Sequence, residues 1–107
     1  MQLRRTPETI ARERGFSEVR RALKPETSDP LSYVVEAFSE IETQRLIVGS
    51  LLVSKDTYDF LSSTAYYRDE KTFWGAELVV VDDLPDRTVI AVPSSNYDAD
   101  FVAVAEW

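Results

Sequence analysis

Two Val-rich runs separated by only five residues constrain the fold of this 107-residue chain most strongly. Ala76–Val81 and Arg87–Val92 have the length and β-branched content of strands, and the connection Asp82–Asp86 contains the turn-forming residues Asp and Pro. We therefore predict two core strands joined by a hairpin turn. Two further strands are expected, one buried at Arg45–Ser54 and one at Phe101–Trp107.

The first 24 residues are expected to form a basic helical arm. Thr6-Pro7-Glu8 combines a hydroxyl N-cap, a proline at the first helical position and an acidic first turn. This helix should break near Gly15, and a second helical turn is predicted from Ser17 to Leu23. Residues 25–30 are polar, contain two prolines and form the predicted linker to a compact domain over residues 31–107.

The compact domain is predicted to be α+β. Apolar residues spaced by three or four positions after Asp29-Pro30 predict one long amphipathic helix over residues 30–43, with an edge strand through Tyr33–Phe38 as the competing interpretation. A shorter helix is expected to open at Ser54 or Asp56. The predicted order is the helical arm, the long helix and then β-α-β-β-β, which gives a small mixed or antiparallel sheet.

Charge is divided unevenly along the chain. Residues 1–24 carry seven basic and three acidic residues, a net charge of +4, whereas the remainder carries five basic and sixteen acidic residues, a net charge of −11. This asymmetry favours an arm that docks on an acidic surface, on a neighbouring copy or on nucleic acid, although a solvated helix face is an equally weighted alternative. A specific nucleic-acid reader is not expected, because the arm has no aromatic residue among its arginines beyond Phe16. The arginines predicted to take part in such an interface are Arg4, Arg5, Arg12, Arg20 and Arg21.

An aromatic stretch supplies the other candidate interface residues. Aromatic side chains and arginine anchor protein interfaces because they bury a large area at low entropic cost. Burial of Phe73 and Trp74 in the core is an equally weighted alternative, and the charge of −11 argues against nucleic acid because like charges repel phosphate. The residues predicted here are Tyr66, Tyr67, Arg68, Phe73 and Trp74.

The composition offers little catalytic chemistry. The chain contains no histidine and no cysteine, and its three glycines form no phosphate-binding loop and no G-x-S-x-G elbow. Asp82, Asp83 and Asp86, together with Asp98 and Asp100, have the side-chain type that binds calcium or magnesium, but the D-x-D-x-D-G…E spacing of a calcium loop is absent. A solvated turn is therefore the favoured interpretation. We therefore expect no enzyme activity, no cofactor, no metal and no small-molecule substrate. No apolar run approaches the ~20 residues of a membrane span, so no membrane partner is expected.

Part of the chain resembles the axial-domain segment of tailed-phage major capsid proteins. LLVSKDTYDFL is similar to the strand and helix opening of that segment, and FWGAELVVVDDLPDRTVIAVP is similar to its later strand, turn and strand. The resemblance covers about half of the chain, which lacks room for the other parts of such a protein. The matching positions are Ser54, Thr57, Tyr58, Gly75, Val79–Val81, Leu84, Pro85 and Thr88–Val92.

The resemblance implies self-assembly or docking onto a capsid lattice, with no catalytic residues to transfer. We expect a structural protein of a tailed virus, located in the virion or the host cytoplasm, with copies of itself or capsid proteins as partners. The alternative is a soluble acidic binding module, an inhibitor or adaptor that mimics nucleic acid toward a basic partner. A metal-dependent hydrolase is the third hypothesis.

Overall fold

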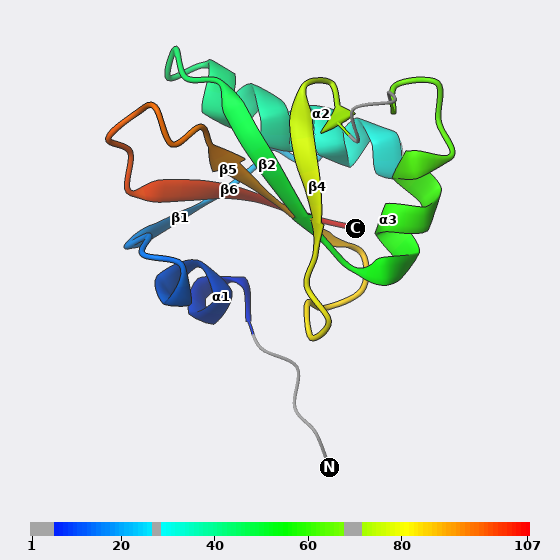
Figure 1. Ribbon diagram of the computed structural model, residues 1–107, viewed down its shortest axis with the longest axis horizontal. Coiled ribbons are helices and arrows are strands. Elements are labelled where there is room, and N and C mark those ends of the chain that lie inside the picture. Colours follow the sequence, from blue (N-terminus) through cyan, green and yellow to red (C-terminus); the bar gives the residue numbers. More distant parts are fainter. Residues whose placement is uncertain (1–5, 27–28, 68–71) are drawn as a thin grey trace.

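The protein has an α+β fold in which helices cover both faces of one mixed sheet (Figure 1). The computed structural model describes residues 6–26, 29–67 and 72–107. Over these residues the chain forms three helices and six strands, which are α1 (Pro7–Glu13), β1 (Glu18–Arg21), α2 (Pro30–Glu42), β2 (Val48–Val53), α3 (Lys55–Ser62), β3 (Thr72–Phe73), β4 (Ala76–Val80), β5 (Thr88–Pro93) and β6 (Phe101–Glu106).

The sheet order is β1-β6-β5-β2-β4-β3. β2 lies near the centre, where it pairs parallel with β4 and antiparallel with β5. β6 pairs antiparallel with β5 and parallel with β1, and the short β3 pairs antiparallel with β4. Parallel strands need a long crossover connection. α3 lies in the connection from β2 to β4, whereas β1 and β6 are separated by most of the chain.

Each helix begins at the capping residue that the sequence indicates. The side-chain oxygens of Thr6, Asp29 and Ser54 accept hydrogen bonds from backbone N–H groups in the first turns of α1, α2 and α3. Proline occupies the first turn of α1 and α2. The helix predicted over residues 30–43 is therefore α2, and the competing edge strand through Tyr33–Phe38 is wrong. Of the two caps considered for α3, Ser54 is the correct one.

The two faces of the sheet bury separate apolar clusters. The first cluster joins α2 and α3 to one face through residues such as Val34, Ile41 and Leu61. The second cluster places Ile10 and Ala11 of α1 against residues of β2, β5 and β6 on the other face. Figure 1 shows α2 behind the sheet and α1 at the lower left, below β1 and β6. Because α1 has only seven residues, it cannot cover the whole of the second face.

The helical turn predicted from Ser17 to Leu23 is wrong, because residues 18–21 form β1. Val19 pairs with Val102 of β6 and packs into the second cluster. β6 would otherwise be an unpaired edge, so a strand here satisfies backbone groups that a short helix would leave unpaired. Within the described part of the predicted arm, residues 6–24, only α1 is helical. β1 belongs to the same sheet as the other five strands, and residues 25 and 26 follow it in sequence.

The hairpin predicted at Asp82–Asp86 is also wrong. β4 and β5 are not neighbours, because β2 lies between them and pairs with both. The connection therefore crosses the end of β2, where the Val81 N–H donates a 2.9 Å hydrogen bond to the Val53 carbonyl. Leu84 is fully buried in the second cluster, so the connection is anchored by an apolar side chain.

Candidate interaction surfaces

Two of the predicted interface arginines make contacts within the domain. Arg20 pairs with Glu18 at 2.7 Å and lies over the Phe101 ring, 4.0 Å from its centroid. Arg21 forms ion pairs with Glu8 of α1 and Glu106 of β6. The ion pairs of Arg21 therefore connect β1 to α1 and to β6.

The other predicted arginines differ in position. Arg12 is exposed on α1, and Arg14, which was not predicted to take part in an interface, is exposed at the C-terminal cap of this helix. Arg4, Arg5 and Arg68 lie outside the described residues. The exposed positive charge of α1 is therefore carried by Arg12 and Arg14.

The predicted aromatic residues form one connected group, which we call the aromatic surface and define as Tyr66, Tyr67, Phe73 and Trp74. The Trp74 ring centroid lies 4.5 Å from that of Phe73 and 5.1 Å from that of Tyr66. Phe38 of α2 meets Trp74 edge-on at 5.4 Å. Phe73 is fully buried, whereas Tyr66 and Trp74 remain 44% and 38% exposed. The alternative of burial in the core is thus confirmed for Phe73, on which the two exposed rings rest, while the interface remains a prediction.

Trp74 lies at the tip of a two-residue hairpin between β3 and β4. Phe73 pairs with Ala76, and the two residues between them have positive φ angles, 53° at Trp74 and 83° at Gly75. This combination matches a type I′ turn, which requires positive φ at both central positions. Glycine adopts this geometry freely, but for a bulky residue such as tryptophan it is disfavoured. In this conformation the Trp74 ring contacts the rings of Phe38, Tyr66 and Phe73.

Tyr67 is linked to α3. Its hydroxyl lies 3.3 Å from that of Tyr58, and the two rings meet edge-on. The hydrogen bond with Tyr58 and partial burial raise the pKa of Tyr67 above its ordinary value of 10.0. The pair connects the aromatic surface to the helix that follows β2.

The acidic residues of the β4–β5 connection do not gather into a metal site. Among residues 6–26, 29–67 and 72–107, no three acidic side chains lie in an arrangement that could hold a metal ion. Asp82 and Asp86 are exposed at the surface, and the connection is anchored by Leu84 instead.

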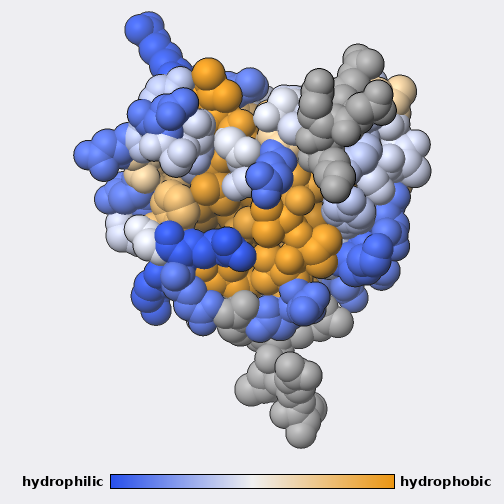
Figure 2. Space-filling view, in the orientation of Figure 1, coloured by the Kyte–Doolittle hydropathy of each residue, from blue (hydrophilic) through white to orange (hydrophobic). Residues whose placement is uncertain are grey.

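A second candidate surface lies on the face of the sheet that α1 covers only in part. Figure 2 shows an apolar area in the middle of this face, bordered by hydrophilic residues. A hollow of about 450 Å³ lies here, between the α1–β1 turn and β4. We call it the sheet groove. Its lining residues are Phe16, Gly49, Ser50, Glu77, Val79, Val92, Pro93, Ser94, Ser95, Tyr97 and Ala99.

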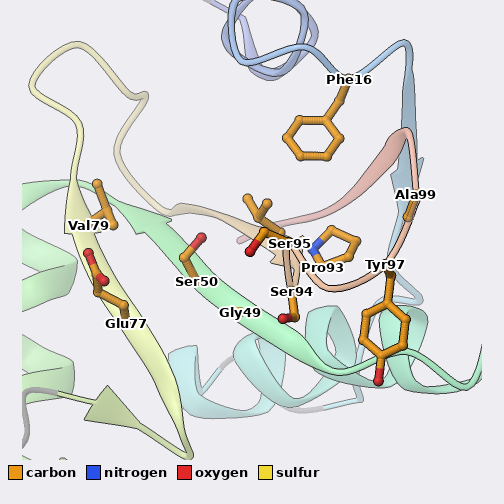
Figure 3. A pocket seen from close by; sticks show the side chains of 11 residues that line it. Phe16, Gly49, Ser50, Glu77, Val79, Pro93, Ser94, Ser95, Tyr97 and Ala99 are labelled. Carbon is orange, nitrogen blue, oxygen red and sulfur yellow. The ribbon is translucent and has the colours of Figure 1, made fainter.

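The residues that line the sheet groove come from four parts of the chain, which are the α1–β1 turn, β2, β4 and the end of β5 with the connection after it. In Figure 3 the Phe16 side chain points from the α1–β1 turn toward the sheet, while Glu77 and Val79 lie on the opposite side on β4. Asp100 holds the first wall in place, because its carbonyl accepts the N–H groups of Ser17 and Glu18. The Asp100 carboxylate also accepts a 3.1 Å hydrogen bond from the Ser17 hydroxyl.

Gly49 shapes the floor of the sheet groove. The register of β2 with β5 shifts between Val48 and Ser50, which leaves Gly49 in a bulge. A Cβ at this position would lie 2.7 Å from the Cα of Ser94. The two backbones can approach this closely only because residue 49 has no side chain.

The sheet groove is lined by both polar and apolar side chains. The groove presents serine and tyrosine hydroxyls, one carboxylate and half-buried apolar groups such as Val79 and Val92. The chain has no histidine or cysteine that could activate one of these hydroxyls. The groove was not predicted from the sequence, because its walls meet only in the observed strand order.

No protein-family model matches this chain, and no curated protein or solved structure is significantly similar to it. Within its described residues the chain has no helix of the length and apolar character needed to cross a membrane. The capsid-protein resemblance therefore stays a prediction from the sequence.

Proposed function

We propose that this protein is a non-enzymatic structural protein that assembles through protein–protein contacts, with the aromatic surface as a principal contact. Its proposed setting is the head of a tailed virus particle, where it would contact other copies of itself or capsid proteins. The resemblance of Leu51–Leu61 and Phe73–Pro93 to capsid axial domains supports that setting.

The observation that carries the proposal is the exposure of two pre-positioned aromatic rings. Tyr66 and Trp74 contact each other, and both rest on the buried Phe73. Rigid aromatic side chains are favoured anchors of interfaces, because little rotational freedom remains to be lost on binding. The disfavoured backbone of Trp74 adds support, since such strain tends to be retained where it serves a function.

The acidic binding module remains a second proposal. It is favoured by the net charge of −7 and by exposed carboxylates, such as Asp82 in the β4–β5 connection and Asp98 in the β5–β6 connection. Binding of this kind to a basic partner would weaken steeply with salt. Contacts made by apolar rings would persist at high salt.

The proposed contact is tested by combining Tyr66→Ser with Trp74→Asn and measuring mass by sedimentation. We expect the wild type to form species larger than the 12.2 kDa monomer and the double variant to lose the largest of them. Leu23→Ser is the matched control, because it removes another exposed apolar side chain that lies in the β1–α2 connection. Equal masses for the wild type and the folded double variant would overturn the role of the aromatic surface.

A further inference from the structure

Another hollow lies at the edge of the sheet where β2 and β6 end. β5 is antiparallel to both of these strands, so β2 and β6 run in the same direction. The hollow has a volume of about 430 Å³, and its lining residues follow β2 and β6, precede β5 and open α2 and α3. We call it the strand-end pocket. In open α/β sheets, ligands bind outside the carboxyl ends of the strands, and this volume is typical of such sites.

Two aromatic side chains line the strand-end pocket. Phe60 of α3 is 40% exposed, and Trp107 follows β6 at the C end of the chain, which lies beside α3 (Figure 1). The Trp107 N–H donates a 2.9 Å hydrogen bond to the Arg87 carbonyl. The Trp107 ring packs on that of Tyr33 in α2, with 5.6 Å between centroids. The Trp107 wall is therefore positioned by the fold before any ligand binds.

Three charged side chains line the same pocket, namely Asp56, Asp86 and Arg87. Asp86 already takes part in an interaction within the chain. Asp56 and Arg87 form no salt bridge with each other or with any other residue that the structure describes. Lys55, the neighbour of Asp56, is engaged by Asp59 at 2.7 Å. The pocket thus offers a ligand one negative and one positive charge.

The backbone of Arg87 has a conformation that long side chains rarely adopt. Its φ angle is 63°, in the left-handed region. Strain of this kind tends to be retained where it serves a function. The conformation of Arg87 is thus a second observation, independent of the charges, that indicates a functional role for this edge of the sheet.

We infer that the strand-end pocket binds a small zwitterion, an α-amino acid with an aromatic or large apolar side chain. The ligand ammonium group would pair with the Asp56 carboxylate, and the ligand carboxylate with the Arg87 guanidinium. The ligand side chain would lie against Phe60 and Trp107. A ligand with a single charge would leave one of the two pocket charges without a partner. The ligand is bound and released unchanged, and the inference goes beyond the proposed function without depending on it.

Calorimetric titration of the wild type with L-phenylalanine and L-leucine tests the inference. Two analogues separate the charges, because phenethylamine lacks the carboxylate and 3-phenylpropionate lacks the ammonium group. We expect saturable binding of phenylalanine and binding of each analogue that is weaker by about tenfold or more, since one charge-assisted hydrogen bond is lost. Titration at two temperatures ensures that a binding enthalpy near zero at one of them is not taken for absence of binding. The inference is overturned if an analogue binds as tightly as phenylalanine, or if neither amino acid binds.

Two variants locate the site. Arg87→Gln should weaken phenylalanine binding about tenfold and leave phenethylamine binding unchanged. Asp56→Asn should weaken phenylalanine binding to a similar extent and leave 3-phenylpropionate binding unchanged. A merely structural role would weaken all three ligands alike.

Asp98→Asn is the matched control, because it removes an exposed carboxylate of the β5–β6 connection that does not line the pocket. Its affinity for phenylalanine should equal that of the wild type. Urea unfolding verifies that each variant is folded. If the folded Arg87→Gln and Asp56→Asn variants bind phenylalanine as tightly as the wild type, the binding lies elsewhere and the inference is overturned.

Discussion

The Cα of Ser94 lies only 2.7 Å from the position that a Cβ on Gly49 would occupy. The Ser94 N–H also donates a 2.7 Å hydrogen bond to the Ile47 carbonyl, so the end of β5 is held against the start of β2. This close approach sets the floor of the sheet groove.

Gly49→Ala is expected to destabilise the protein, because backbone atoms of Ser94 must move to admit the methyl group. Overpacking of this kind costs about 1–3 kcal/mol of unfolding free energy. Urea denaturation measures the change. Ser50→Ala is the matched control in the same strand and should stay within about 0.5 kcal/mol of the wild type. Equal stability of Gly49→Ala and the wild type would contradict the close approach.

Ile10→Ala tests whether α1 belongs to the folded domain. Ile10 is 1% exposed in the second cluster, and loss of a buried side chain of this size costs about 2–5 kcal/mol. Arg12→Ala, two positions along the same helix, should change the unfolding free energy by less than about 0.5 kcal/mol because its side chain is exposed. If Ile10→Ala were as stable as Arg12→Ala, α1 would be an undocked arm.

The helices of this fold depend on local sequence, whereas the strand pairing depends on residues far apart in the chain. Capping residues and spacing were sufficient for α1, α2 and α3, because a helix start is determined by neighbours in sequence. β1 was mispredicted because its stability comes from pairing with β6, about eighty residues later. The Asp82–Asp86 turn was taken for a hairpin because its composition does not reveal that β2 lies between the strands it joins.

The two candidate surfaces also differ in how far local sequence predicts them. The aromatic surface was predictable because its residues are close in sequence and of the types that anchor interfaces. The sequence did not predict which of these rings is buried, because only the packing of the domain encloses Phe73 and leaves Trp74 partly exposed. The sheet groove combines Phe16, Ser50, Val79 and Tyr97 from four distant segments, and no local pattern relates them.

Trp74→Asn separates assembly from stability. Asparagine tolerates positive φ, so relief of about 1–2 kcal/mol of backbone strain should offset the lost ring contacts of similar size. We expect the unfolding free energy to change by less than about 1 kcal/mol while assembly weakens. Trp74→Ala loses the rings without this relief and should be the less stable of the two. A Trp74→Ala variant that is more stable than Trp74→Asn would contradict the strain assigned to the backbone of Trp74.

The Tyr58–Tyr67 pair makes stability depend on alkaline pH. Because the pKa of Tyr67 is raised in the folded state, the unfolded chain loses this proton first as pH rises. The contribution is complete below the ordinary value of 10.0 and is lost as pH rises through the higher folded value. Urea unfolding across this range should show a decline that is shallower in Tyr67→Phe. An identical decline in both proteins would show that the pair does not cause it.

The most direct test of the central claim is the mass of the wild-type protein across a concentration series at low and high salt. Assembly through apolar contacts predicts species larger than 12.2 kDa that grow with concentration and persist when salt screens the charges. A 12.2 kDa monomer at every concentration and at both salt levels would contradict assembly and favour the acidic binding module.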